Sequence, residues 1–199
     1  MATPPTFHEA IPAHPVMSVQ FGPERLQDVL QADAQAVTVS SIELRHLSKL
    51  VEVMREYGKT VFVNIDAIAG ISQDRGGVMF LESVGVSGVI TTRGSLISRI
   101  QGSGMVAMQK VFVTDRSNLA RMQDSVGQSN PDYVQMMPLP VVNMLTPEEL
   151  APFKNIIAAG FIRNLDDVKI ALENGAVGVS SSTVELWSKS GIQGLYEKK

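Results

Sequence analysis

Short apolar runs recur along the chain, and segments with helical periodicity lie between them. The runs are continuous rather than alternating, as expected for parallel strands whose two faces are both covered by helices. Successive runs begin about 23 residues apart, which is typical of a short repeat of one strand and one helix. We predict strands at residues 16–20, 36–40, 60–66, 88–91, 106–111, 132–136, 156–160 and 177–180.

The segments between the runs carry helix signals. Leu47, Leu50, Val51 and Met54 follow the i, i+3, i+4, i+7 spacing of one buried helix stripe. Residues 138–155 break the pattern, because four prolines leave room only for a short helix. The repeats predict an α/β fold: a compact, single-domain (β/α)8 barrel of the TIM type over residues 16–199, with one outer helix shortened.

The first fifteen residues differ from the rest of the chain. They contain four prolines and no lysine or arginine, so they do not match a secretory signal. We predict that residues 1–15 form a flexible N-terminal arm leading into the first strand.

Two segments near the C-terminus carry the strongest functional signal. Residues 156–163 and 175–182 are each an apolar run that ends at small residues before a predicted helix. Helix starts expose backbone N–H groups that bind anions, and barrels of this type hold phosphate after their last two strands. The predicted phosphate site consists of Gly160, Phe161, Arg163, Ser180 and Ser181. In the serine run, backbone N–H groups rather than hydroxyls are the expected ligands.

Polar residues at other strand ends are predicted to surround this phosphate. Asp66, Arg93, Gln109 and Lys110 should lie at the same mouth of the barrel. The cations complement a phosphate, and the carboxylate accepts hydrogen bonds from hydroxyl groups, so the set suits a polyol phosphate. A shift of one residue in strand register decides whether Gln109 or Lys110 points inward.

Composition narrows the chemistry further. The 199 residues include no cysteine, which excludes disulfides and thiolate chemistry, and the three histidines do not cluster in sequence. We therefore predict no metal site and no cofactor. The apolar runs are too short to span a membrane. The formal net charge of −3 lacks the basic excess of generic nucleic-acid binders, so any contact with RNA must come from a local cluster of cations.

Several motifs occur in an order that resembles a known family, the glycerol-3-phosphate-responsive antiterminators that regulate bacterial glycerol-uptake operons. The matching pieces are Asp66 with Gly70, then residues 88–93, 109–112, 131–133, 160–163, 175–182 and 185–187. Lys110 stands where an arginine is common in that family, and Asn64 replaces a frequent histidine. The resemblance implies a cytoplasmic regulator that binds glycerol 3-phosphate as an effector and acts on leader mRNA to prevent termination, with self-association possible.

Two classes of function remain open. One is the ligand-gated RNA regulator, in which Arg75, Arg93 and Arg99 contribute phosphate contacts to an RNA-facing surface. The other is a barrel isomerase or lyase that acts on a small phosphorylated metabolite. The acidic net charge favours the enzyme, whereas the motifs at residues 91–93 and 109–110 favour the regulator. No pair of groups identifies a general acid and base, so no catalytic residue is predicted.

Overall fold

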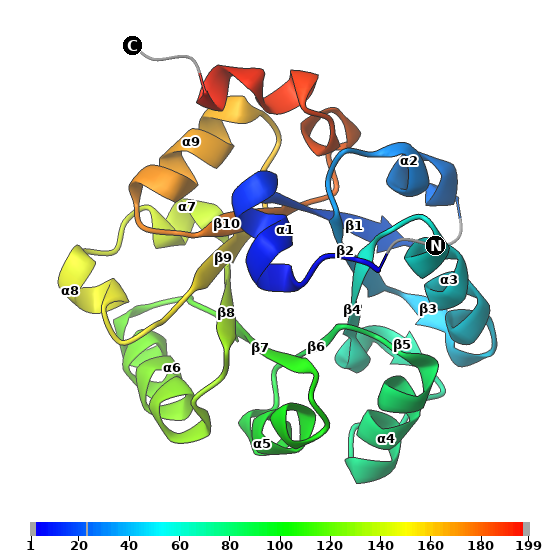
Figure 1. Ribbon diagram of the computed structural model, residues 1–199. Helices are drawn as coiled ribbons and strands as arrows, with labels where there is room; N and C mark the ends of the chain where they lie inside the picture. The colour runs from blue at the N-terminus through cyan, green and yellow to red at the C-terminus, as the bar shows by residue number, and fades with distance from the viewer. Residues whose placement is uncertain (1–2, 23, 197–199) are drawn as a thin grey trace.

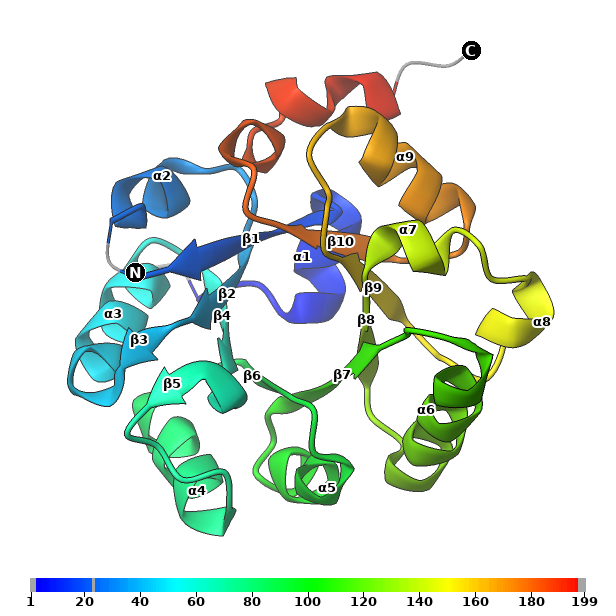
Figure 2. The same cartoon turned by 180° about the vertical axis from the view of Figure 1, so that it is seen from behind.

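The computed structural model describes residues 3–22 and 24–196, and within them eight parallel strands close into a barrel (Figures 1 and 2). The order around the barrel is β1-β10-β9-β8-β7-β6-β4-β2. The strands are β1 (Val16–Phe21), β2 (Ala36–Ser40), β4 (Thr60–Asn64), β6 (Gly88–Thr91), β7 (Val106–Phe112), β8 (Tyr133–Met137), β9 (Ile156–Ala159) and β10 (Gly178–Ser181). Each predicted run coincides with one barrel strand, so the predicted (β/α)8 barrel is confirmed.

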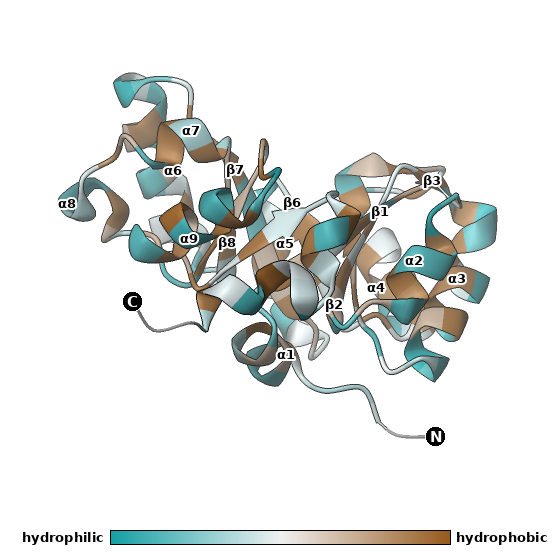
Figure 3. Ribbon diagram, turned by 90° about the horizontal axis from the view of Figure 1, so that it is seen from above, coloured by the Kyte–Doolittle hydropathy of each residue, from teal (hydrophilic) through white to brown (hydrophobic). Residues whose placement is uncertain are grey.

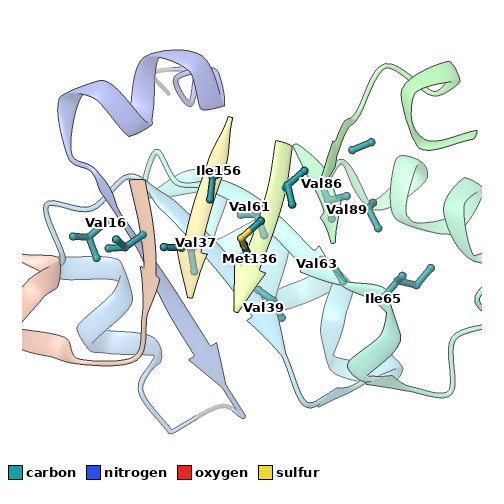
Figure 4. Close-up of a cluster of buried hydrophobic side chains, with 14 of the residues drawn as sticks. Val16, Val37, Val39, Val61, Val63, Ile65, Val86, Val89, Met136 and Ile156 are labelled. Atoms are coloured by element: carbon teal, nitrogen blue, oxygen red, sulfur yellow. The ribbon is translucent and has the colours of Figure 1, made fainter. Parts of the chain in front are cut away.

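Helices surround this barrel on its outer side (Figure 1). They are α2 (Leu26–Gln31), α3 (Leu44–Glu56), α4 (Arg75–Val84), α5 (Gly94–Gly102), α6 (Arg116–Ser129), α7 (Leu139–Val142), α8 (Pro147–Leu150) and α9 (Leu165–Glu173). Side chains that alternate along the strands point outward and pack against these helices. Figure 4 shows part of that layer, with Val37, Val61 and Met136 among the fully buried side chains. The predicted stripe on α3 is confirmed, because Leu47, Leu50, Val51 and Met54 are all buried. In Figure 3 the helices turn hydrophilic residues toward the outside.

Three short segments lie at the periphery of the barrel. The prediction of a shortened outer helix is confirmed, since residues 138–155 form only the four-residue helices α7 and α8. A two-stranded parallel sheet of β3 (Ile42–Glu43) and β5 (Ile68–Ala69) lies outside the barrel. Such short strands leave no detectable periodicity in the sequence. After β10, the chain continues as two 3-10 helices, η2 (Val184–Trp187) and η3 (Ser190–Leu195).

The prediction of a flexible arm is wrong for most of residues 1–15; of these, residues 1–2 lie outside the described part. Helix α1 (Phe7–Ala13) covers the N-terminal end of the barrel, in the centre of Figure 1 and below the strands in Figure 3. The Phe7 ring lies 4.5 Å from that of Phe62 and 4.7 Å from that of Tyr133. Phe7 is 1% exposed, so α1 closes one end of the barrel and leaves the other as the only place for a mouth within the described residues.

Candidate functional site

A cavity of about 300 Å³ opens at the C-terminal ends of the strands, on the side opposite α1 and facing the viewer in Figure 2. This is the end at which (β/α)8 barrels place their ligands. Its walls come from the ends of β1, β2, β4, β7, β8, β9 and β10. The lining residues are Val19, Phe21, Thr38, Ser40, Asn64, Lys110, Gln135, Met137, Ala159, Gly160, Phe161, Ile162, Arg163, Ser180, Ser181, Ser182 and Thr183.

The loop after β9 supplies unpaired N–H groups at this cavity. Gly160 and Phe161 have φ angles of +77° and +61°, which turn the backbone sharply at the end of the strand. Phe161 adopts the left-handed region although side chains disfavour it, and such outliers concentrate at functional sites. Within the described residues, the N–H groups of Gly160, Phe161 and Ser182 donate to no other group. All three residues line the cavity, so their N–H groups are available to an anion there.

The helix after this loop does not itself offer free donors. Asn164 accepts from the N–H of Asp167, and the Asp167 carboxylate accepts from the N–H groups of Arg163 and Asn164. The start of α9 is therefore already capped by its own side chains. The predicted helix after Ser180 and Ser181 is a four-residue 3-10 helix instead. A phosphate at this mouth thus relies on the loops rather than on two helix dipoles.

Hydrogen bonds between the two strand ends fix the distance between their donors. Ser181 Oγ donates to the carbonyl of Ile162 at 2.8 Å, and Thr183 Oγ1 donates to the same oxygen at 3.1 Å. Trp187 Nε1 donates to the carbonyl of Ser181 at 2.8 Å. The Ser181 hydroxyl therefore holds the site together, while Ser180 is buried at its inner wall. The Ser181 hydroxyl is thus engaged within the protein, as expected if the hydroxyls are not the main phosphate ligands, and the roles of both serines toward a ligand stay a prediction.

Among the described residues, two cations line the cavity, and of these Arg163 lies over the Phe161 ring whereas Lys110 enters from the barrel wall. Lys110 points inward from β7 and is half-buried. Burial lowers the pKa of its ammonium, and the nearby charge of Asp66 partly opposes that shift. In the described part of the chain it forms no ion pair and no hydrogen bond. A half-buried ammonium without a partner is unfavourable unless a ligand supplies the missing anion.

Gln109 is not part of the mouth. Its side chain points away from the barrel toward α6, where Nε2 donates to Ser125 Oγ at 3.0 Å and Oε1 accepts from Ser129 Oγ. It is 1% exposed, so these hydroxyls satisfy it in place of water. The prediction of Gln109 at the mouth is wrong, and the register assigns that position to Lys110.

Asp66 and Arg93 also lie away from the cavity wall. Both oxygens of Asp66 accept hydrogen bonds from Thr91 and Thr92, the shortest from the Thr92 N–H at 2.6 Å. Asp66 follows β4, Thr91 ends β6 and Thr92 follows it, so the carboxylate joins two neighbouring strand ends. Arg93 is exposed at the start of α5 and does not line the cavity. The prediction that these two side chains line the mouth with Lys110 is therefore wrong.

An Asp66→Ala variant should test that structural role. We expect its free energy of unfolding to fall by about 1–3 kcal/mol, because Thr91 and Thr92 lose a shared charged acceptor. Affinities for glycerol 3-phosphate and inorganic phosphate should change by the same factor. Urea denaturation and calorimetry measure the two effects, with the exposed carboxylate variant Asp124→Ala as control. A selective loss of glycerol 3-phosphate binding would show instead that Asp66 contacts the hydroxyl end.

The predicted site residues do not include a polar wall of the cavity formed by the ends of β2, β4 and β8. Thr38 and Asn64 line the cavity, and Thr38 Oγ1 and Asn64 Oδ1 are buried without a hydrogen-bond partner. Asn64 Nδ2 donates to Ser40 Oγ at 3.4 Å, and Gln135 completes this wall. Buried polar atoms are rarely left unpaired, so these atoms indicate a polar ligand. The available signal was alternation: Thr38, Ser40 and Asn64 occupy inward positions at the ends of predicted strands.

No group of three or more acidic, histidine or cysteine side chains in the described residues is arranged to hold a metal ion. Residues 3–22 and 24–196 also include no helix long and apolar enough to cross a membrane.

Comparison with known proteins identifies the family of this chain. A sequence model described as "Glycerol-3-phosphate responsive antiterminator" matches residues 16–187, which is most of the chain and includes every wall of the cavity. The chain belongs to this family. Its members are described as regulators that respond to glycerol 3-phosphate, so the resemblance recognised in the sequence is confirmed.

Individual relatives of this antiterminator-family chain are distant. The uncharacterized protein YgcP of Escherichia coli K12 is 24% identical over 178 residues, covering 88% of this chain and 92% of YgcP. A glycerol uptake operon antiterminator regulatory protein from Listeria monocytogenes is 24% identical with a TM-score of 0.75, covering 85% of this chain and 94% of its own. A glycerol uptake operon antiterminator-related protein from Thermotoga maritima is 20% identical with a TM-score of 0.78. The match covers 87% of this chain and 98% of the Thermotoga chain.

Barrel enzymes share the fold as well. A deoxyribose phosphate aldolase from Aeropyrum pernix is 15% identical with a TM-score of 0.70, covering 92% of this chain and 91% of the aldolase. At such identity the likeness concerns the fold alone. Family membership therefore favours a regulator, and the barrel itself is compatible with an enzyme.

Proposed function

We propose that the cavity binds glycerol 3-phosphate as a regulatory effector. The phosphate would accept hydrogen bonds from the N–H groups of Gly160, Phe161 and Ser182, with Lys110 as its counter-ion. The glycerol hydroxyls would meet the polar wall, where Thr38 and Asn64 carry unpaired buried atoms. The size supports this assignment, because about 300 Å³ is at the small end of ligand cavities and suits a three-carbon phosphate.

One observation carries this proposal most directly. The half-buried Lys110 ammonium has no partner in the described residues and faces unpaired backbone donors across one cavity. All of these groups are donors, so the missing partner is an anion with several oxygens. The family is described by its response to glycerol 3-phosphate, so we infer that this ester is the anion that binds. The regulated partner we propose is leader mRNA, with antitermination of glycerol-uptake genes in the cytoplasm as the outcome.

Calorimetry with matched ligands tests the effector. Glycerol 3-phosphate should bind, and unphosphorylated glycerol should show no measurable binding, because the strongest donors point at the phosphate. Inorganic phosphate should bind more weakly than the ester, since it leaves Thr38 and Asn64 unpaired. Equal affinity for glycerol and its phosphate would contradict the proposal.

A second function is favoured by the position of Lys110, whose amine lies inside the barrel cavity without a partner in the described residues and whose pKa is lowered by burial. A neutral amine inside a barrel can add to the carbonyl of a phosphorylated aldehyde or ketone, the first step of a lyase that uses a Schiff base. Turnover of triose phosphates, or an adduct on Lys110 after borohydride reduction, would support this enzyme. The absence of both alongside tight glycerol 3-phosphate binding would leave the regulator.

A further inference from the structure

Three phenylalanine side chains are exposed around the mouth of the cavity. Phe21, Phe112 and Phe161 have exposed fractions of 54%, 48% and 61%. Phe21 ends β1, Phe112 ends β7 and Phe161 follows β9, and the first and third line the cavity. Phe112 lies two residues after Lys110, so it points to the same side of its strand, and it pairs with the cavity residue Met137. We call these three side chains the aromatic rim.

Cations and polar groups lie between the rings. The guanidinium of Arg163 is 5.4 Å from the centroid of the Phe161 ring, a cation–π distance. Arg25 donates from Nη1 to the carbonyl of the cavity residue Ser182 at 3.2 Å. The rings are therefore not one continuous apolar patch of the kind that packs against another protein. Exposed ring faces interleaved with cations instead suit unstacked nucleobases joined by phosphates.

We propose that the aromatic rim binds single-stranded RNA by base stacking, so that the RNA lies across the mouth above the effector. This inference rests on the proposed function and assigns the surface on which its RNA partner binds. RNA in that position would cover the only opening of the cavity within the described residues. Glycerol 3-phosphate should then leave the complex more slowly than it leaves the free protein.

The sequence predicted a different RNA-facing surface, formed by Arg75, Arg93 and Arg99, and its Arg75 and Arg99 part provides the contrast. Arg75 and Arg99 are exposed and line the same shallow depressions between α4 and α5. None of the residues in those depressions lines the barrel cavity, and none of them is aromatic. RNA bound there would contact phosphates without stacking its bases. The two surfaces therefore differ in whether the nucleobases matter.

The test compares short fluorescein-labelled single-stranded RNAs of mixed sequence with abasic strands of the same backbone, at fixed salt and saturating glycerol 3-phosphate. Wild-type protein should prefer the base-containing strands. Phe112→Ala should weaken their binding about tenfold, the effect of losing one stacked base, and should leave the abasic strands unaffected. Its glycerol 3-phosphate affinity should equal that of wild type, because Phe112 does not line the cavity. Phe112→Trp should restore RNA binding.

Tyr57→Ala is the matched control, since Tyr57 is 59% exposed and follows α3 at the opposite end of the barrel. Equal RNA affinities of Phe112→Ala and Tyr57→Ala would overturn the proposal. So would a loss confined to Arg75→Ala and Arg99→Ala, or a change in sedimentation that shows the rim to be a contact between two copies. Wild-type protein that binds none of the strands would also overturn it, because stacking tolerates any sequence. None of these results would change the calorimetric test of the effector.

Discussion

A Lys110→Met variant should lose about tenfold to a hundredfold in affinity for glycerol 3-phosphate, or about 1.5–3 kcal/mol for one charge-assisted hydrogen bond. Methionine keeps much of the side-chain volume but removes the ammonium that faces the phosphate loop. The ligand-free protein should not lose stability, because an unpaired, half-buried ammonium contributes little to the fold. Calorimetry and urea denaturation of the same samples separate the two effects.

The pH dependence of binding gives this variant an internal control. Burial lowers the pKa of Lys110, so its ammonium deprotonates at a lower pH than an exposed lysine does. Wild-type affinity for glycerol 3-phosphate should therefore fall as pH rises toward the ordinary lysine range. In Lys110→Arg the guanidinium stays charged, and the affinity should hold over the same range. A large loss of stability in Lys110→Met, or identical pH profiles, would show that the ammonium is not the phosphate's counter-ion.

The strands and the sharp turn after β9 at Gly160 could be predicted because their signals in the sequence are local. A continuous apolar run followed by Gly160 and a capped helix fixes both the strand and the turn after it. The side chains that point into the barrel were harder to predict, because alternation along a strand allows two registers and only the packed barrel selects one. Lys110 and Gln109 illustrate this: Gln109 finds Ser125 and Ser129 on α6, and the sequence gives no sign of that pairing.

Long-range partners also explain the other errors in the site. Asp66 at a strand end suits a ligand contact, but Thr91 and Thr92 of a later strand occupy both of its oxygens. The residues that do face the ligand position, Thr38 and Asn64, are neutral and drew less attention than charges. Asn64 stands at a predicted strand end, but a neutral side chain there does not by itself indicate a ligand, and only the packed barrel shows that its oxygen is left unpaired.

The N-terminal helix was missed for a similar reason, since its stability comes from distant contacts. Seven residues with one internal proline do not form a stable helix alone. Helix α1 exists because Phe7, Ala10 and Ile11 fill the end of the barrel beside Phe62 and Tyr133. The four prolines in residues 1–15 favoured a flexible arm, but packing against the barrel overrides that preference.

A Phe7→Ala variant should consequently lose about 3–5 kcal/mol of unfolding free energy, the usual cost of emptying a large aromatic site in a core. Phe7 is 1% exposed, and its ring contacts Phe62 and Tyr133 at the floor of the barrel. The control is Phe112→Ala, where an exposed ring should change stability by about 0.5 kcal/mol or less. Urea denaturation measures both. Equal midpoints for the two variants would mean that α1 does not close the barrel in solution, whereas a large difference would show that the segment predicted to be flexible is part of the core.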